Sequence, residues 1–557
     1  MRSFKSFVCC TALALMATVA HAGVMNPIPS DPITIESGKL SGTLLDGGIR
    51  AYLGVPFAAP PVRELRWRAP EPVKPWSGIY NADTKLTNCY IPLRATTLNH
   101  YFGELRSSED CLYANIWVPP NTRPDAKLPV VVWIHGGGFQ EGSINFDIYG
   151  GQEIAKKGVI YMGISYRVGI MGNMAHPELT KESGHNASGN WGMMDQIAGL
   201  KWIQRNIAAF GGDAKNVTLG GQSAGAGAAA AHVISPGSAG LFHRAIFQSG
   251  GYSPIAPLAA ARERGIKFAD AAGCKGSDAQ IALCLRALPA AKVAALSGTE
   301  SATSAFVSGP MIDGTVIPRQ AIDAFSTGRF ARMPIMMGTT RDEGNFTAGI
   351  AQYFKKDRSA ITRKEFGDYV QRTYGGNAGP GGTPPAYPKD AVPALTKHYA
   401  GVVPHQNWAA LHGDMLACRG LHVAGAIAKH APLYMYRFDD RTAPSYFPKM
   451  DGFTPGAYHT GDIPYVFIGY HGGPDGLRVP LTQKQTSLSD KMIAAWANFA
   501  ATGNPNGRGD APWPRWQAGD ARPAYFLQDD AWKNTLSNAQ FAAAHYCGFF
   551  NSILLHK

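Results

Sequence analysis

The sequence contains few features of metalloproteins, nucleic-acid-binding proteins or membrane proteins. It has no CxxC pair and no HExxH motif, two patterns that commonly hold zinc. Its lysines and arginines are dispersed, without a basic block or a recognisable nucleic-acid-binding motif. After the N-terminal 22 residues, no apolar run is long enough to cross a bilayer as a helix. We therefore expect no metal site, no nucleic-acid partner and no integral membrane segment.

The composition is that of a folded globular protein. Of the 557 residues, 45% are hydrophobic and only 17% are charged, which argues against long disordered stretches. Length alone favours two or more domains. The formal net charge is +12. A solvated basic surface is the simplest explanation, and attraction to anionic envelope surfaces or acidic substrates is the alternative.

The first 22 residues have the pattern of a secretory signal peptide. Arg2 and Lys5 form a positive start, residues 7–19 are mostly apolar, and Ala20-His21-Ala22 is an A-x-A cleavage site. The apolar part is too short to span a bilayer as a stable helix. We expect residues 1–22 to be removed and the mature protein to be exported, either to the periplasm or out of the cell.

Cysteine is rare, and its distribution agrees with export. Cys9 and Cys10 lie within the signal peptide, so six of the eight cysteines remain in the mature chain. An even number in an exported protein is typical of disulfides. Six cysteines allow 15 pairings, and spacing alone favours only Cys274 with Cys284. The six are Cys89, Cys111, Cys274, Cys284, Cys418 and Cys547.

The strongest chemical signal is the stretch Gly221-Gln222-Ser223-Ala224-Gly225. It follows the β-branched, apolar run 216–220 and precedes the alanine-rich run 226–232, so strand, turn and helix predict a nucleophile elbow. The helix N-terminus would favour an oxyanion that develops beside Ser223. In a chain with 64 glycines the pattern alone is more often an ordinary turn. The hypothesis therefore requires a base, an acid and an oxyanion hole elsewhere.

A triple glycine supplies a candidate oxyanion hole. The apolar run 128–134 predicts a buried strand that leads into His135-Gly136-Gly137-Gly138-Phe139. Glycines at this point let backbone N–H groups face a cavity. Alone, such a run is usually a flexible turn, but an HGGG motif ahead of a GxSxG motif is typical of lipases and esterases.

Strand-like and helical segments alternate through the centre of the chain. We expect strands over 159–165, 216–220 and 245–247, with a helix over 193–209. This alternation predicts an α/β protein with a large, mostly parallel central sheet flanked by helices. Further strands are expected over 334–338 and 433–438, and a further helix over 489–501.

Together these motifs resemble the type-B carboxylesterases, α/β-hydrolases related to the cholinesterases and to bacterial nitrobenzyl-ester esterases. The resemblance is to a bacterial, exported member and runs from about residue 33 to 550. It implies one large α/β-hydrolase domain over 23–557, which replaces the two-domain expectation. The matching stretches are 54–61, 108–113, 135–139, 165–169, 189–196 and 206–226.

The resemblance also supplies partners for Ser223. The family acid lies in an Asp-Glu-Gly motif, which implies Glu343, and the family base precedes a turn and an aromatic run, which implies His459. The order Ser223, Glu343, His459 is that of α/β-hydrolases. From the residues alone, Glu343 could be a solvated turn carboxylate, and His459 is one of 16 histidines. Asp342 and Asp462 are the nearest rival acids.

Other roles follow only from the resemblance. It implies oxyanion-hole N–H groups on Gly137, Gly138 and Ala224, a supporting hydroxyl on Ser249 near the triad, and no cofactor or metal. It implies the disulfides Cys89–Cys111, Cys274–Cys284 and Cys418–Cys547. It also implies the structural ion pairs Arg66–Glu109 and Arg167–Asp195.

Two positions depart from the family pattern. Gln222 stands where the family usually has glutamate, so a negative charge is missing near His459 and the base should lose its proton more easily. The segment from Cys89 to Cys111 has no tryptophan, the residue that binds quaternary ammonium groups in cholinesterases. Tyr90, Tyr101 and Phe102 are weaker substitutes, so choline esters are not expected as preferred substrates.

The sequence therefore predicts an exported serine esterase with a small-molecule ester substrate. Medium-sized esters of partly apolar or aromatic alcohols and acids are expected. A non-catalytic binding or adhesion protein on the same fold is the alternative from another class. An amidase, a carbamate hydrolase or a lipase would use the same acyl chemistry.

Overall fold

The computed structural model describes most of the chain. The described residues are 26–90, 106–184, 186–297, 309–375, 388, 390–401, 403–467, 479–509, 511–519 and 521–553. The expected signal peptide lies outside them, as do Tyr101 and Phe102 of the segment between Cys89 and Cys111.

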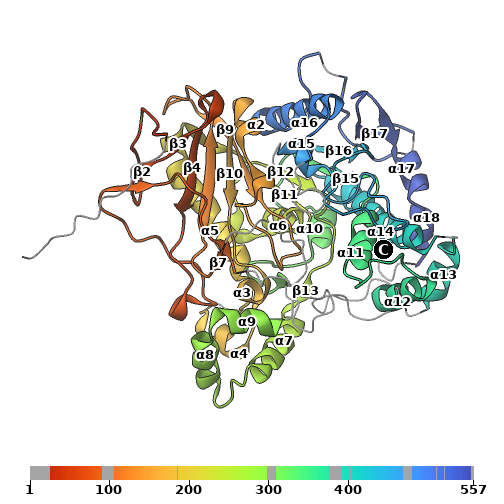
Figure 1. Cartoon of the computed structure of the whole chain (residues 1–557), viewed down its shortest axis with the longest axis horizontal. Coiled ribbons are helices and arrows are strands. Elements are labelled where there is room, and N and C mark those ends of the chain that lie inside the picture. Colours follow the sequence, from red (N-terminus) through yellow and green to blue (C-terminus); the bar gives the residue numbers. More distant parts are fainter. Residues whose placement is uncertain are drawn as a thin grey trace, which may run out of the picture.

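An 11-stranded sheet forms the centre of the molecule (Figure 1). Its strand order is β18-β17-β16-β15-β12-β11-β9-β10-β8-β4-β3. Every neighbouring pair from β17 to β10 is parallel, and antiparallel pairs close both ends. This confirms the large, mostly parallel sheet predicted from the sequence. The strands are β3 (Thr43–Leu44), β4 (Arg50–Pro56), β8 (Tyr113–Val118), β9 (Leu128–Ile134), β10 (Ile160–Ile164), β11 (Gly212–Gln222), β12 (Arg244–Gln248), β15 (Ile335–Thr340), β16 (Leu433–Phe438), β17 (Pro523–Gln528) and β18 (Thr535–Ser537).

Helices cover the sheet and extend beyond it. They are α2 (Gln152–Lys156), α3 (Gly169–Asn173), α4 (Pro177–Glu182), α5 (Trp191–Asn206), α6 (Ala224–Ile234), α7 (Leu258–Ala271), α8 (Asp278–Ala287), α9 (Ala290–Ser297), α10 (Ala321–Thr327), α11 (Gly344–Tyr353), α12 (Arg363–Tyr374), α13 (Ala391–His398), α14 (Pro404–Ala428), α15 (Ile463–Val466), α16 (Gln483–Thr502), α17 (Asn538–Ala544) and α18 (Cys547–Ile553). Small sheets pair β1 (Ile33–Ile35), β2 (Gly38–Ser41) and β5 (Ile79–Asn81), β6 (Asn88–Cys89) with β7 (Ser107–Ser108), and β13 (Ala256–Pro257) with β14 (Met311–Ile312).

Both faces of the sheet are buried, as the apolar run of β9 predicts. Val130, Val132 and Ile134 pack into one hydrophobic cluster, whereas Val131 and Trp133 pack into another. Successive side chains of a strand point to opposite faces, so a strand with a core on each side is apolar throughout.

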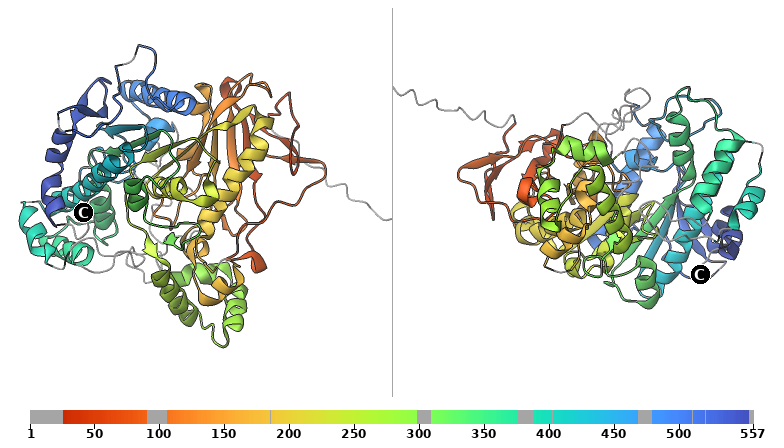
Figure 2. Two further views of the ribbon diagram at one scale, coloured as in Figure 1. Left: turned by 180° about the vertical axis from the view of Figure 1, so that it is seen from behind. Right: turned by 90° about the horizontal axis from the view of Figure 1, so that it is seen from below.

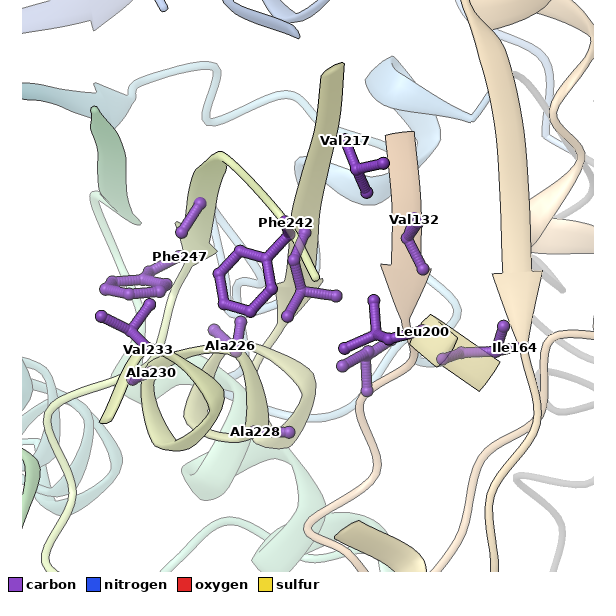
Figure 3. Close-up of a cluster of buried hydrophobic side chains, with 14 of the residues drawn as sticks. Val132, Ile164, Leu200, Val217, Ala226, Ala228, Ala230, Val233, Phe242 and Phe247 are labelled. Atoms are coloured by element: carbon purple, nitrogen blue, oxygen red, sulfur yellow. The ribbon is translucent and has the colours of Figure 1, made fainter. Parts of the chain in front are cut away.

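Different helices complete the two cores. On one face, Leu200 of α5 and Val233 of α6 belong to the same hydrophobic cluster as Val132, part of which Figure 3 shows. On the other face, Met492 and Trp496 of α16 join the cluster that contains Trp133. The alanines of α6 are small enough for this helix to lie close to the strands, which holds the residue at its N-terminus against the sheet.

A smaller helical lobe projects from one side of the sheet. It gathers α4, α7, α8 and α9 (Figures 1 and 2) around a separate apolar cluster that includes Met174, Phe268 and Leu285. Among the described helices, none by itself is apolar over a length that could cross a membrane, although the bent pair α8 and α9 passes by length and composition.

The structure contains the three disulfides that the family resemblance implies. They are Cys89–Cys111, Cys274–Cys284 and Cys418–Cys547. The two implied ion pairs are also present. Arg66 Nε lies 2.6 Å from Glu109 Oε1, and Arg167 Nη2 lies 2.7 Å from Asp195 Oδ1.

Two helices differ from their predicted bounds. The predicted helix 193–209 begins at Trp191 and changes at Ile207 into a 3-10 turn that ends at Phe210. The predicted helix 489–501 begins earlier, at Gln483, because Thr482 and Gln485 form a capping box that satisfies free N–H groups at its start.

Candidate active site

Ser223 occupies a strained turn between β11 and α6. Its backbone has φ 57° and ψ −121°, a conformation that residues with a side chain rarely adopt. The flanking glycines permit this turn, because a β-carbon on Gly221 would collide with the backbone of Gly225, and one on Gly225 would collide with the carbonyl of Ile134. The GxSxG spacing is therefore a steric requirement of the elbow.

The triple-glycine loop lies directly against this elbow. A β-carbon on Gly136 would be only 3.2 Å from Cβ of Ser223. Gly137 and Gly138 have φ 112° and 62°, which turns the chain so that their N–H groups donate to no other group among the described residues. The N–H of Ala224, the first residue of α6, has no intrahelical partner by position. The two motifs thus supply three N–H groups for which the described part of the chain shows no acceptor.

Glu343 lies three residues after β15, directly before α11, and is 2% exposed. Its Oε1 accepts hydrogen bonds of 2.8 Å from Thr339 Oγ1 and from the N–H of Thr340, and its Oε2 lies 2.5 Å from His459 Nδ1. Burial raises the pKa of this carboxyl, but the charge and hydrogen bond of His459, together with the Ser249 hydroxyl and the Thr340 N–H, hold the pKa at about 2. Glu343 is therefore ionised at neutral pH.

His459 comes from the segment that precedes α15. Burial lowers the pKa of its imidazole. The charge and the hydrogen bond of the Glu343 carboxylate together raise this pKa by more, so the net shift is upward. The ring of Phe346, on α11, packs 5.4 Å from the imidazole. This aromatic contact was missed from the sequence, although Phe346 stands one helical turn after Glu343.

The two rival acids do not contact the imidazole. Asp342, next to Glu343 in the chain, instead binds Arg441 and the N–H of Ala457. Asp462 is fully buried, and burial together with the Glu343 charge raises its pKa to about 7. The geometry therefore brings Glu343, and neither neighbour, to Nδ1 of His459.

The other imidazole nitrogen meets Gln222 rather than Ser223. The Gln222 side chain is almost fully buried, and its Nε2 lies 3.2 Å from His459 Nε2. No hydrogen bond joins the Ser223 hydroxyl to His459 in the part of the chain that the structure describes. Sequence reasoning identified Gln222 as a variant position but did not predict this contact.

Ser249 lies behind the acid, at the end of β12. Its N–H donates to the carbonyl of Gly338 at 2.8 Å, and its buried hydroxyl lies close enough to Glu343 to lower the pKa of that carboxyl. The supporting role that the resemblance implies for this hydroxyl stays a prediction.

Comparison with known proteins identifies the family of this chain. The sequence model of the carboxylesterase family matches residues 29–544. The chain belongs to this family. It is 34% identical to fumonisin B1 esterase from Sphingopyxis macrogoltabida over 496 residues, which cover 86% of this chain and 84% of the relative. It is 30% identical to acylcarnitine hydrolase from Mus musculus over 521 residues, which cover 90% of this chain and 88% of the relative.

Membership settles the class of fold and reaction. This carboxylesterase has the α/β-hydrolase fold, and it hydrolyses carboxylic ester bonds. Both relatives are named as enzymes, an esterase and a hydrolase, which favours catalysis over the alternative of a non-catalytic binding or adhesion protein.

Proposed function

We propose that this carboxylesterase works through a catalytic triad of Ser223, His459 and Glu343. The observation that carries the proposal is the 2.5 Å contact between His459 Nδ1 and Glu343 Oε2. His459 also contacts Gln222, the residue directly before the strained Ser223 elbow. The residues are 116 to 236 positions apart in the chain, and the fold assembles them from the ends of β11 and β15 and the segment before α15.

The first half of the reaction acylates the serine. Nε2 of His459 takes the Ser223 proton as Oγ attacks the ester carbonyl carbon, and Glu343 stabilises the imidazolium that forms. The tetrahedral oxyanion accepts hydrogen bonds from the N–H groups of Gly137, Gly138 and Ala224. Collapse of the intermediate expels the alkoxide, which takes the proton from His459 and leaves as the alcohol.

The second half releases the acid. Water replaces the alcohol, His459 takes its proton, and the water oxygen attacks the acyl-enzyme carbonyl. The second tetrahedral intermediate uses the same three N–H donors. Its collapse returns the proton to Ser223 Oγ and frees the carboxylic acid. None of these steps requires a cofactor or a metal.

The substrate class is proposed from sequence and relatives together. We propose medium-sized esters that are partly apolar or aromatic. Choline esters are not proposed as preferred substrates, because the segment from Cys89 to Cys111 has no tryptophan for a quaternary ammonium group. The names of the two relatives, an esterase of fumonisin B1 and a hydrolase of acylcarnitine, indicate that the family accepts chemically different substrates.

We also propose export of a one-domain enzyme. The A-x-A motif that ends at Ala22 and three disulfides support removal of residues 1–22 and an oxidising destination for residues 23–557.

The deciding experiment compares Ser223→Ala with the parent on p-nitrophenyl esters of increasing acyl length. Ser552→Ala, at an exposed serine on α18, is the matched control. We expect Ser223→Ala to lose hydrolysis and Ser552→Ala to retain it. Undiminished turnover by Ser223→Ala would exclude the proposed nucleophile, and faster cleavage of matched anilides or carbamates than of esters would contradict the substrate class.

A further inference from the structure

The carboxylate of Asp342 is bonded to the segment that leads into His459. We call residues 454–458 the base segment, because His459 follows it directly. Asp342 Oδ2 accepts the N–H of Ala457 at 2.9 Å, and the N–H of Asp342 donates to the carbonyl of Ala457, also at 2.9 Å. Asp342 and Tyr458 form a β-bridge at the same point. The residue beside the acid thus holds the chain two residues before the base.

Asn345 makes a second attachment, further back along the base segment. Its Nδ2 donates to the carbonyls of Thr454 at 3.1 Å and Pro455 at 2.8 Å. Its own N–H donates to the carbonyl of Asp342 at 3.0 Å. The two attachments therefore come from one short turn at the start of α11, on either side of Glu343.

The base segment is shaped to receive Asp342. Gly456 has φ 59°, and a β-carbon there would lie 2.5 Å from Asp342 Oδ2. The carboxylate is also oriented from its other side, because Arg441 Nε lies 2.8 Å from Oδ2 and Nη2 lies 3.1 Å from Oδ1. A fork-shaped guanidinium fixes the plane of the carboxylate that it binds.

These contacts differ in how much they depend on charge. The side chain of Arg441 is 56% exposed, and Asp342 and Arg441 line a polar cavity of about 500 Å³. Solvent therefore weakens the electrostatic contribution of this ion pair. The hydrogen bond from Ala457 is the contact that reaches the base segment directly.

We propose that Asp342, with Asn345, is a positioning residue that holds His459 against Glu343. The inference rests on the proposed triad and adds to it residues that touch neither the ester nor the imidazole. Because Glu343 lies on the same turn as Asp342 and Asn345, a displacement of that turn moves His459 together with Glu343. The contact between Glu343 and His459 is thus kept although the two residues come from distant parts of the chain.

The test measures kcat and KM separately on a p-nitrophenyl ester. In Asp342→Ala the base segment loses its side-chain acceptor, and we expect kcat to fall about 10²-fold, the typical cost of misplacing a reacting group by about 1 Å. KM should stay close to that of the parent, because Asp342 does not contact substrate in the proposed mechanism. Asn345→Leu, which keeps the γ-branched shape but loses the amide that donates to both carbonyls, should lower kcat in the same way.

A conservative series separates positioning from charge. Asp342→Asn keeps an oxygen that can accept the Ala457 N–H, and Arg441→Gln removes only the exposed charge partner. Both should retain most of the parental kcat. If Asp342 acted through its charge, Asp342→Asn would be as impaired as Asp342→Ala, and that result would overturn the proposal.

Two controls keep the outcome interpretable. Asp368→Ala removes an exposed aspartate that pairs with Lys364 on α12 and should leave both constants unchanged. Near-ultraviolet circular dichroism and thermal unfolding identify any variant that fails to fold. A parental kcat in folded Asp342→Ala would overturn only the positioning role of Asp342. Undiminished activity in Ser223→Ala would overturn the catalytic triad on which that role rests.

Discussion

The side-chain nitrogen of Gln222 lies 3.2 Å from Nε2 of His459, while Nδ1 of the same ring lies 2.5 Å from Glu343. In this orientation of the Gln222 amide its nitrogen faces the ring as a donor, which favours the neutral tautomer that accepts at Nε2 and carries its proton on Nδ1, toward Glu343. This is the tautomer that a general base needs, although in this structure the Nε2 electron pair faces Gln222 rather than Ser223.

The same contact opposes protonation of the base. Once Nε2 carries a proton, it faces the N–H of Gln222, and the amide must turn its oxygen toward the ring or move away. A glutamate at this position would accept that proton as a hydrogen bond and stabilise the imidazolium. Having Gln222 in place of a glutamate therefore changes the stability of the charged imidazolium of His459 more than that of the neutral ring.

Gln222→Glu should raise the pKa of the kinetic base. The added carboxylate favours the imidazolium, so the acidic limb of kcat/KM against pH moves to higher pH. Gln371→Glu, which adds the same charge at an exposed position of α12, is the matched control and should leave the limb in place. An acidic limb that coincides with that of the parent would contradict the assigned contact.

Glu343→Gln should lower kcat by about 10²–10⁴-fold, the range typical of general acid–base catalysis. The neutral amide no longer stabilises the imidazolium, so the pKa of His459 loses its upward shift. The acidic limb of the pH profile should move to lower pH, opposite to the shift in Gln222→Glu. The two variants together test whether the His459 imidazole sets the acidic limb. A shift of the limb in the same direction in both variants would show that His459 does not set it.

Glu343 should also make folding sensitive to acid. Its pKa is about 2 in the folded protein against an ordinary value of 4.5. Because the folded pKa is lower, the carboxylate stabilises the fold above pH 4.5, and this contribution is lost as pH falls from 4.5 toward 2. Thermal unfolding between pH 5 and 3 should therefore depend less steeply on pH in Glu343→Gln. Equal pH dependence in the two proteins would contradict the lowered pKa.

The two oxyanion-loop glycines should tolerate alanine differently. A β-carbon on Gly137 would collide with the carbonyl of Glu141, whereas one on Gly138 meets nothing within 4 Å. Gly137→Ala should displace the loop and lower kcat by about 10²–10³-fold, the usual cost of one lost donor. Gly138→Ala, at a φ of 62° that alanine can adopt with some strain, should have a smaller effect. Equal kcat values for the two variants would contradict this geometry.

The three disulfides should differ in their contribution to stability. Cys418–Cys547 joins residues 129 positions apart, whereas Cys274–Cys284 joins residues only 10 apart. Loop-closure entropy predicts that loss of the longer link costs about 2 kcal/mol more. Denaturant unfolding of the two double-alanine variants measures the difference. Equal losses would show that strain or residual structure outweighs the entropy of the unfolded chain.

Local requirements made some features predictable from sequence alone. Gly221 and Gly225 are needed because the backbones around Ser223 approach too closely for a β-carbon, and this constraint acts within five residues. The apolar run 128–134 likewise predicted a buried strand, and each residue of β9 from Val130 to Ile134 reaches one core or the other. Glu343 and His459 were identifiable only through the family resemblance.

Tertiary structure decided which side chains meet. Glu343 and His459 lie 116 residues apart, and no local pattern distinguishes Glu343 from Asp342 beside it. The fold does so by directing one carboxylate to the imidazole and its neighbour to the base segment. It likewise directs Gln222, rather than Ser223, to Nε2 of His459. Such contacts depend on the packing of separate strands and helices, so the elbow could be predicted from its glycines but the surroundings of its base could not.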